Sequence, residues 1–159
     1  MPGDERALLR HTVATLAYRS RKVLADVPPG FAAFQASDAS RSAVQILAHM
    51  GDLFDWALSI ALGQQVWKEE TPLPWEEEAL RFYASLRRFD DRLADPADLK
   101  APAAALFQGP IADALTHLGQ IALLRRMAEA PVKGENYYRA EILAGRIEPA
   151  TQASPRREF

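Results

Sequence analysis

The chain contains no cysteine. This absence excludes disulfide bonds, thiolate metal sites and a cysteine nucleophile, and it is compatible with a reducing compartment. The N-terminal residues MPGDERALLRHT also lack the pattern of a secretory signal, because acids and arginines alternate where a signal has a basic start followed by an apolar run. We therefore expect a cytoplasmic protein.

Long apolar runs and an excess of positive charge are also missing. The longest uncharged helical stretch, from Trp56 to Trp67, is shorter than the roughly 18 apolar residues that a membrane span requires. The formal net charge is −2 and the isoelectric point is near 5.9, so no general attraction to nucleic acid or to anionic lipid is expected. Glycine-rich phosphate loops, Gly-x-Ser-x-Gly elbows and His-Glu-x-x-His motifs are absent as well. We expect neither nucleic acid nor a membrane as a partner.

With 159 residues, 48% of them hydrophobic, the chain has the length and composition of one globular domain. Clusters of proline and glycine at 28–30, 71–74, 96–110 and 131–134 divide it into segments. The long segments have helical periodicity and none has the alternation of a strand, so an all-α fold is predicted. We expect one domain over residues 1–147 and a disordered tail over residues 148–159.

The predicted helices are long enough for a four-helix bundle with at least one longer crossover. The first begins near Asp4, and the second runs from a cap within 37–40 to about Gly63. The third opens at Pro74 with acids in its first turn. The fourth runs from residues 109–110 to before Pro131, a short extra C-terminal helix covers 135–144, and AAALF before Pro110 is expected to form a short turn or helix. The first and third helices have clear core stripes, formed by Leu9, Val13, Leu16 and Val23 and by Trp75, Ala79, Phe82, Leu86, Phe89 and Leu93.

The three histidines differ in helical phase. His11 lies about 200° from Leu9 on a helical wheel, so it is expected to face solvent. His49 is in phase with the apolar face of the second helix, and Asp52 lies one turn on and just to the side. His117 is in phase with apolar residues of the fourth helix.

The row of His117 also carries Asp113 and Gln120, and we expect it to face the core. Burying a polar group without a hydrogen-bond partner costs free energy. These side chains must therefore bind to one another, to water or to an ion. Asp113 and His117 are one helical turn apart and could share a divalent metal, with His49 added from a neighbouring helix. Two imidazoles and a carboxylate suit zinc, iron or nickel. The alternative is a hydrogen-bonded core histidine and a simple Asp–His hydrogen bond.

Two segments resemble the DinB/YfiT-like superfamily. ILAHMGDLFDWAL (46–58) is similar to its second-helix signature, and QGPIADALTHLGQIALLRRMAEAPVKGENYYRAEILAGRI (108–147) is similar to the fourth-helix end of one subgroup. The resemblance implies a metal held by His49, Asp113 and His117, with Gln120 supporting the ligands from outside. Many members have histidine in place of Asp113, which leaves the identity of the metal open. Zinc or nickel is expected first, with iron or manganese as alternatives.

The resemblance also implies chemistry with low-molecular-weight thiols, because members include thiol-dependent transferases and isomerases. A bound metal lowers the pKa of a thiol or of water and makes a nucleophile without any protein cysteine. We therefore predict a metal-dependent transferase or hydrolase with a small-molecule substrate. Asp52 is the candidate general base, or alternatively a hydrogen-bonding residue of the site, and Trp56 and Phe54 are candidates for a pocket wall or for core.

A non-enzymatic function is the alternative, in which a metal-stabilised or metal-free helical module associates with a partner. A second apolar strip on the fourth helix lies nearly opposite His117 and predicts a homodimer. It consists of Ile111, Leu115, Leu118 and Ala122.

Overall fold

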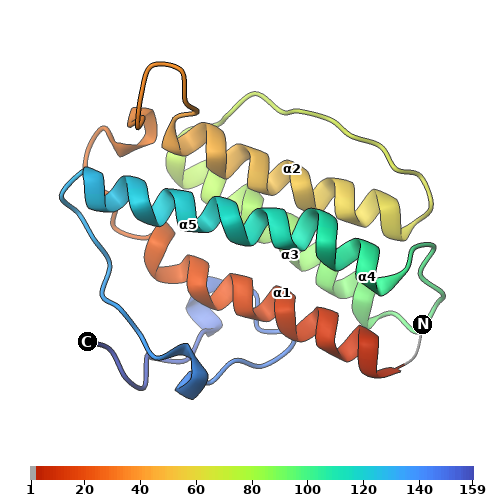
Figure 1. Cartoon of the computed structure of the whole chain (residues 1–159). Helices are drawn as coiled ribbons and strands as arrows, with labels where there is room; N and C mark the ends of the chain where they lie inside the picture. The colour runs from red at the N-terminus through yellow and green to blue at the C-terminus, as the bar shows by residue number, and fades with distance from the viewer. Residues whose placement is uncertain (1–2) are drawn as a thin grey trace.

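The computed structural model describes residues 3–159, and its four long helices form a bundle (Figure 1). They are α1 (Gly3–Leu24), α2 (Ala43–Ala61), α3 (Trp75–Ala94) and α5 (Ala112–Met127). This part of the chain contains no strand, only an isolated bridge between Glu135 and Glu158, so the predicted all-α class is confirmed. No helix in residues 3–159 combines the length and apolarity needed to span a membrane.

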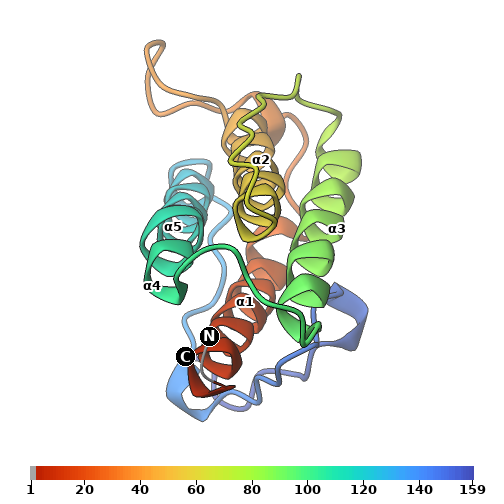
Figure 2. The same ribbon diagram turned by 90° about the vertical axis from the view of Figure 1, so that its right-hand side faces the viewer.

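The chain connects the four helices with one long crossover. The segment 62–74 arches back along α2, so α2 and α3 run in the same direction, whereas α1 and α5 run in the opposite one (Figure 1). Seen from the end, the four helices surround a common interior (Figure 2). The arrangement is a bundle with one crossover, and it sets α2 between α3 and α5.

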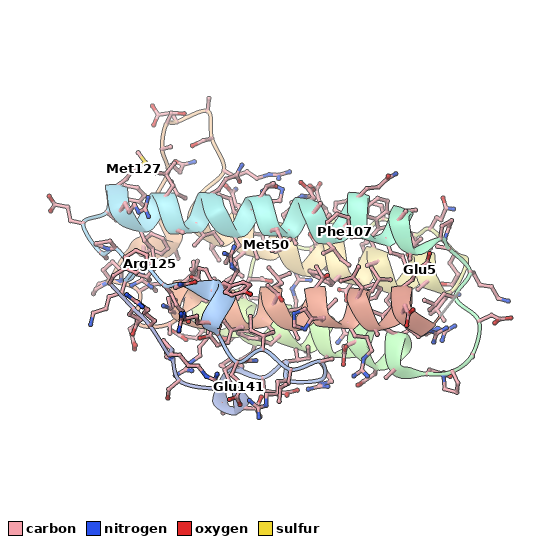
Figure 3. All side chains as sticks on the ribbon, turned by 60° about the horizontal axis from the view of Figure 1, so that its bottom comes forward. Glu5, Met50, Phe107, Arg125, Met127 and Glu141 are labelled. Atoms are coloured by element: carbon pink, nitrogen blue, oxygen red, sulfur yellow. The ribbon has the colours of Figure 1, made fainter. Side chains whose placement is uncertain are left out.

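The interior is formed by the stripes expected for the first and third helices. All four residues of the α1 stripe are buried, and on α3 only Ala79 remains partly exposed. From α2, Met50 fills the space between the helices without any exposed surface, whereas Glu141 lies at the periphery on the C-terminal segment (Figure 3). Removal of this apolar surface from water is the main driving force for folding.

Helix α2 begins later than predicted. Its N-cap is Ser42, whose side chain accepts a hydrogen bond from the Gln45 backbone N–H while Gln45 Oε1 accepts one from the Ser42 backbone N–H. The expected caps fail because Ser37 and Ser40 are already hydrogen-bonded to each other in a turn. The reciprocal pair at Ser42 and Gln45 is a capping box.

Helix α5 is the last part of a longer helical segment. The α4 helix (Ala103–Leu106) continues through a π-helical turn, η2 (Phe107–Ile111), directly into α5. The predicted start at residues 109–110 is therefore too late, although the short helix at AAALF agrees with expectation. Pro110 lacks a backbone N–H and cannot continue a regular helix, and the wider π turn accommodates it.

The short C-terminal helix predicted over 135–144 does not form. The segment contains only the 3-10 turn η3 (Tyr137–Arg139), because its start is extended and paired with the chain end. The Asn136 backbone N–H donates to the Arg157 carbonyl, and an isolated helix of this length is marginal by itself.

Residues 148–159, expected to be disordered, pack back along the bundle. Arg21 of α1 donates to the carbonyl of Ala153, and Lys22 pairs with Glu158 at 3.1 Å. The 3-10 turn η4 (Pro149–Thr151) lies beside α3, where Arg87 pairs with Glu148. Basic residues of α1 and α3 thus hold this segment against the bundle. Helical periodicity in the sequence cannot predict such contacts, because they join residues far apart in the chain.

Candidate metal centre

Three candidate ligands from two helices meet where α2 and α5 pack against each other. One ligand atom each from His49, Asp113 and His117 lies within 4.8 Å of the others. His117 Nε2 is 3.3 Å from Asp113 Oδ1, and His49 Nε2 is 3.6 Å from Asp113 Oδ2. The two imidazole rings stand at 90° with their centroids 4.7 Å apart. The structure therefore brings together the set that the sequence indicated.

The row of Asp113, His117 and Gln120 does not face the core as expected. The side chain of Asp113 is 47% exposed, Gln120 is exposed, and His117 is 13% exposed. The buried row of α5 is its neighbour, one residue further along the chain at each step, formed by Ala114, Leu118 and Ile121. The cluster consequently lies at the rim of the core, where solvent and small molecules reach it.

Gln120 orients one imidazole. Its Oε1 lies 2.8 Å from His117 Nδ1 and can only accept, so Nδ1 carries the proton and donates. His117 Nε2 then presents its lone pair toward Asp113 and His49. A support of this kind fixes the tautomer and orientation of a metal-binding histidine.

The surroundings of His49 favour its neutral form. Burial lowers its pKa, the positive charge of Arg41 and the nearby His117 add to this effect, and Asp113 opposes it. Because the folded-state pKa lies below the ordinary value of 6.5, the contribution of His49 to stability is present above that pH and is lost as the pH falls toward the folded-state value. Its Nδ1 is buried without a hydrogen-bond partner among residues 3–159. A neutral imidazole is the form that binds a metal.

Aromatic side chains cover one side of His49. The Trp67 ring meets the His49 ring at 65° with centroids 5.5 Å apart, and Trp56 meets Trp67 at 89°. Trp56 is partly exposed and contributes to this wall, whereas Phe54 is fully buried in the core. Sequence reasoning missed Trp67, and its only signal was a tryptophan just beyond Gly63, the predicted end of the second helix.

Asp52 lies outside the cluster and is almost completely buried. Its Oδ1 accepts from Arg81 Nη2 at 3.0 Å, and its Oδ2 accepts from the Glu70 backbone N–H at 3.3 Å. Burial raises its pKa, although the Glu70 amide and Arg81 oppose the shift. Both carboxylate oxygens are engaged, so these contacts agree better with the hydrogen-bonding alternative than with a free general base.

Arg81 joins Asp52 to a second buried carboxylate. Arg81 Nε donates to Glu78 Oε1 at 2.5 Å, and Glu78 Oε2 accepts from the Leu73 backbone N–H at 2.8 Å. Gly51 makes room for the guanidinium, because a Cβ atom there would lie 2.9 Å from Arg81 Nη2. The network thereby fixes the crossover 62–74, which carries Trp67, to α2 and α3.

Two cavities flank the cluster, one containing His49 and the other His117. The first, of about 310 Å³, is lined by Arg41, Gln45, Ala48, His49, Asp52, Glu69, Glu70, Thr71 and Pro72. The second, of about 330 Å³, is lined by Ala36, Ser40, Arg41, Ile46, His117, Gln120, Leu123 and Leu124. Both volumes suit small molecules. Arg41, which sequence reasoning also missed, is common to the two.

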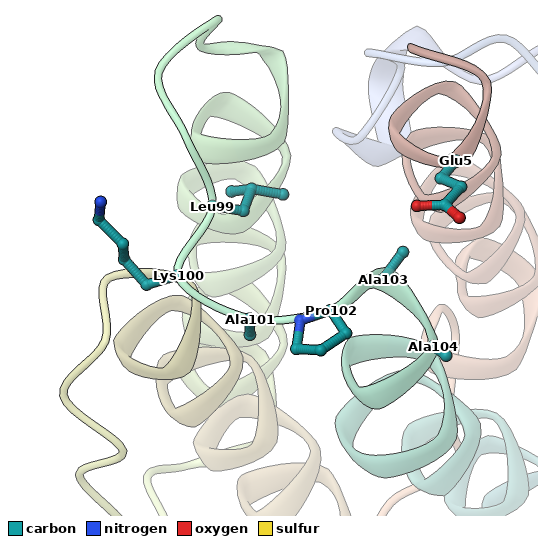
Figure 4. A pocket seen from close by; sticks show the side chains of 7 residues that line it. All are labelled: Glu5, Leu99, Lys100, Ala101, Pro102, Ala103 and Ala104. Atoms are coloured by element: carbon teal, nitrogen blue, oxygen red, sulfur yellow. The ribbon is translucent and has the colours of Figure 1, made fainter. Parts of the chain in front are cut away.

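Another cavity, of about 420 Å³, lies between the start of α1 and residues 99–104 (Figure 4). The described residues that line it include two charged side chains, Glu5 and Lys100, and no histidine. His11 is exposed, as expected, and belongs neither to this cavity nor to the cluster of His49, Asp113 and His117.

No protein-family model, curated protein or solved structure matches the chain. The arrangement around His49, Asp113 and His117 is therefore the basis for assigning a function.

Proposed function

We propose that the protein is a divalent-metal-dependent enzyme of the DinB/YfiT-like kind, a thiol-dependent transferase or a hydrolase. The observation that supports the proposal is the convergence of two imidazole nitrogens and a carboxylate within 4.8 Å at the rim of two cavities. Zinc and nickel accept this donor set readily, and iron or manganese are the alternatives. Three protein ligands leave coordination positions open, as in catalytic rather than structural sites.

Each residue then has a defined task. His49, held neutral by burial, and His117, oriented by Gln120, present their Nε2 atoms, while Asp113 supplies a negative charge. The ion, when bound, lowers the pKa of a coordinated thiol or water. Trp67 shields His49 on one side. Asp52 accepts a hydrogen bond from the Glu70 backbone N–H and so holds the crossover in place. Because this contact occupies the carboxylate, we assign Asp52 first to positioning and only second to proton transfer.

The competing proposal, a helical module acting through association, has less support from the packing. Ile111 and Leu118 are buried, and Leu115 and Ala122 pack against the core. The apolar strip on which a homodimer was predicted is therefore used largely for packing within the chain. A homodimer remains a prediction that needs a different surface.

The test combines metal analysis with turnover. Zinc-loaded protein is expected to hold about one ion per chain and to accelerate reaction of a low-molecular-weight thiol with an activated aryl halide, or hydrolysis of an activated ester. The two substrates separate a transferase from a hydrolase. The His49→Ala variant should lose both metal and activity, while His11→Ala should keep both.

Bound metal without turnover of either substrate would favour the non-enzymatic module. Absence of bound metal at saturating zinc would overturn the proposal, and the two histidines would then be hydrogen-bonding residues only.

A further inference from the structure

We propose that the substrate of the metal centre carries an anionic group, a carboxylate at the end of an apolar chain, and that Arg41 recognises it. The inference rests on the proposed metal-dependent function and specifies its substrate class. It starts from the position of Arg41 between two cavities, one on each side of the candidate ligands.

Arg41 is available for a ligand. Its side chain is 47% exposed, and its ion-pair partner within residues 3–159 is Glu69, at 3.9 Å. That distance is too long for a hydrogen bond, so the guanidinium fork is free to form a bidentate contact. The planar fork matches a carboxylate better than a point charge does.

The two cavities differ in charge, and this difference selects where an anion binds. The cavity beside His49 contains three carboxylates, from Asp52, Glu69 and Glu70, which repel an anion. Among the described residues that line the cavity beside His117, the only carboxylate or guanidinium side chain is that of Arg41. A carboxylate is therefore favoured in the second cavity.

The remaining lining of the second cavity is suited to an apolar chain. Ile46, Leu123 and Leu124 lie along it, and Leu123 is 54% exposed. Covering this apolar surface with the methylene groups of a ligand removes both from water and favours binding. His117 and Gln120 also line this cavity, so a ligand bound there can reach both the candidate ion site and Arg41.

The net charge expected for the metal-loaded centre also favours an anionic ligand. A divalent ion held by two neutral imidazoles and the carboxylate of Asp113 keeps one net positive charge, and Arg41 adds another. Such a concentration of positive charge at a cavity attracts anions and disfavours cations.

The experiment compares two thiols with the same number of carbons and different terminal groups, the anionic ω-mercaptohexanoate and the neutral ω-mercaptohexanol. Cobalt(II)-loaded protein is titrated with each, and the sulfur-to-cobalt charge-transfer absorption reports the dissociation constant. We expect the carboxylate to bind about fivefold more tightly at low salt, and the preference to shrink as salt is added. Arg41→Gln should abolish the preference, whereas the matched change Arg126→Gln, at an exposed arginine of α5, should preserve it.

The outcomes separate the two proposals. If cobalt does not bind, the proposed function fails and the inference fails with it. If cobalt binds but takes up neither thiol, the inference and the thiol-dependent transferase are overturned, whereas the hydrolase is not. If both thiols bind cobalt with equal affinity, or if the preference persists in Arg41→Gln, only the inference is overturned.

Discussion

Among the single residues of the candidate centre, Asp113 is the one that supplies charge. Asp113→Asn keeps the size and hydrogen bonding of the side chain but leaves two neutral imidazoles for a dication, so zinc affinity should fall by at least about tenfold. Because the side chain is half exposed, the stability of the metal-free protein should change by no more than about 0.5 kcal/mol. Metal titration and urea unfolding of the same sample measure the two effects.

Asp113→His is the matched substitution. It places a neutral imidazole ligand at a position where the side chain is half exposed. The variant should therefore still bind metal, with its preference shifted toward zinc or nickel. Metal-replete Asp113→Asn together with unstable Asp113→His would show that Asp113 only hydrogen-bonds His117.

Gln120 provides a second residue-scale prediction, because it acts on the metal only through His117. Gln120→Leu removes the acceptor for the Nδ1 proton and should weaken metal binding by about tenfold, as for other groups that orient metal-binding histidines. Gln120→Glu keeps an acceptor and should retain the affinity. Equal metal affinities for wild type and Gln120→Leu in a competition titration with a chelator would contradict this role.

At the scale of elements, the crossover 62–74 depends on Arg81. Arg81→Leu leaves Asp52 and Glu78 buried without their cation, and we expect a loss of about 3–5 kcal/mol in the free energy of unfolding. Hydrogen exchange at the amides of Glu70 and Leu73 should rise, because their acceptors lose their positions. Urea unfolding and amide exchange are the measurements.

Arg88→Leu on the same helix is the control. The Arg88 side chain is half exposed and pairs with Asp55 at the surface, so its removal should cost less than about 1 kcal/mol and leave the crossover amides protected. Similar losses in both variants would indicate a general effect on α3 rather than release of the crossover.

At the scale of the whole molecule, metal binding should be linked to folding. An ion that binds only the folded chain stabilises it by about 2.7 kcal/mol at one hundred times its dissociation constant. For a domain of this size, that corresponds to a rise of about 5–10 °C in Tm. Thermal unfolding with zinc and with chelator should show this rise in wild type and His11→Ala, but not in His49→Ala. A Tm that is unchanged by chelator in wild type would contradict metal binding.

The sequence pattern was sufficient to predict the four long helices and to indicate the candidate ligand residues. Helical periodicity is a local property, so the stripes of α1 and α3 identified the buried faces directly. The spacing of Asp113 and His117 placed both on one side of a helix for the same reason. The phase of His49 on the second helix made it the third member of the set, and the resemblance implied the same three residues.

The tertiary structure decided the rotation of α5, the boundaries and the surroundings of the site. Asp113 and His117 precede Ala114 and Leu118 by one residue, and α5 has apolar residues on two sides, so periodicity could not choose which row faces the core. Packing against both α1 and α2 made that choice and left the ligands at the rim. Arg41 and Trp67 approach the site from segments outside the helices, where no periodic pattern indicates direction. Residues 148–159 likewise obtain their order from Arg21, Lys22 and Arg87, contacts made only after the bundle has brought distant parts of the chain together.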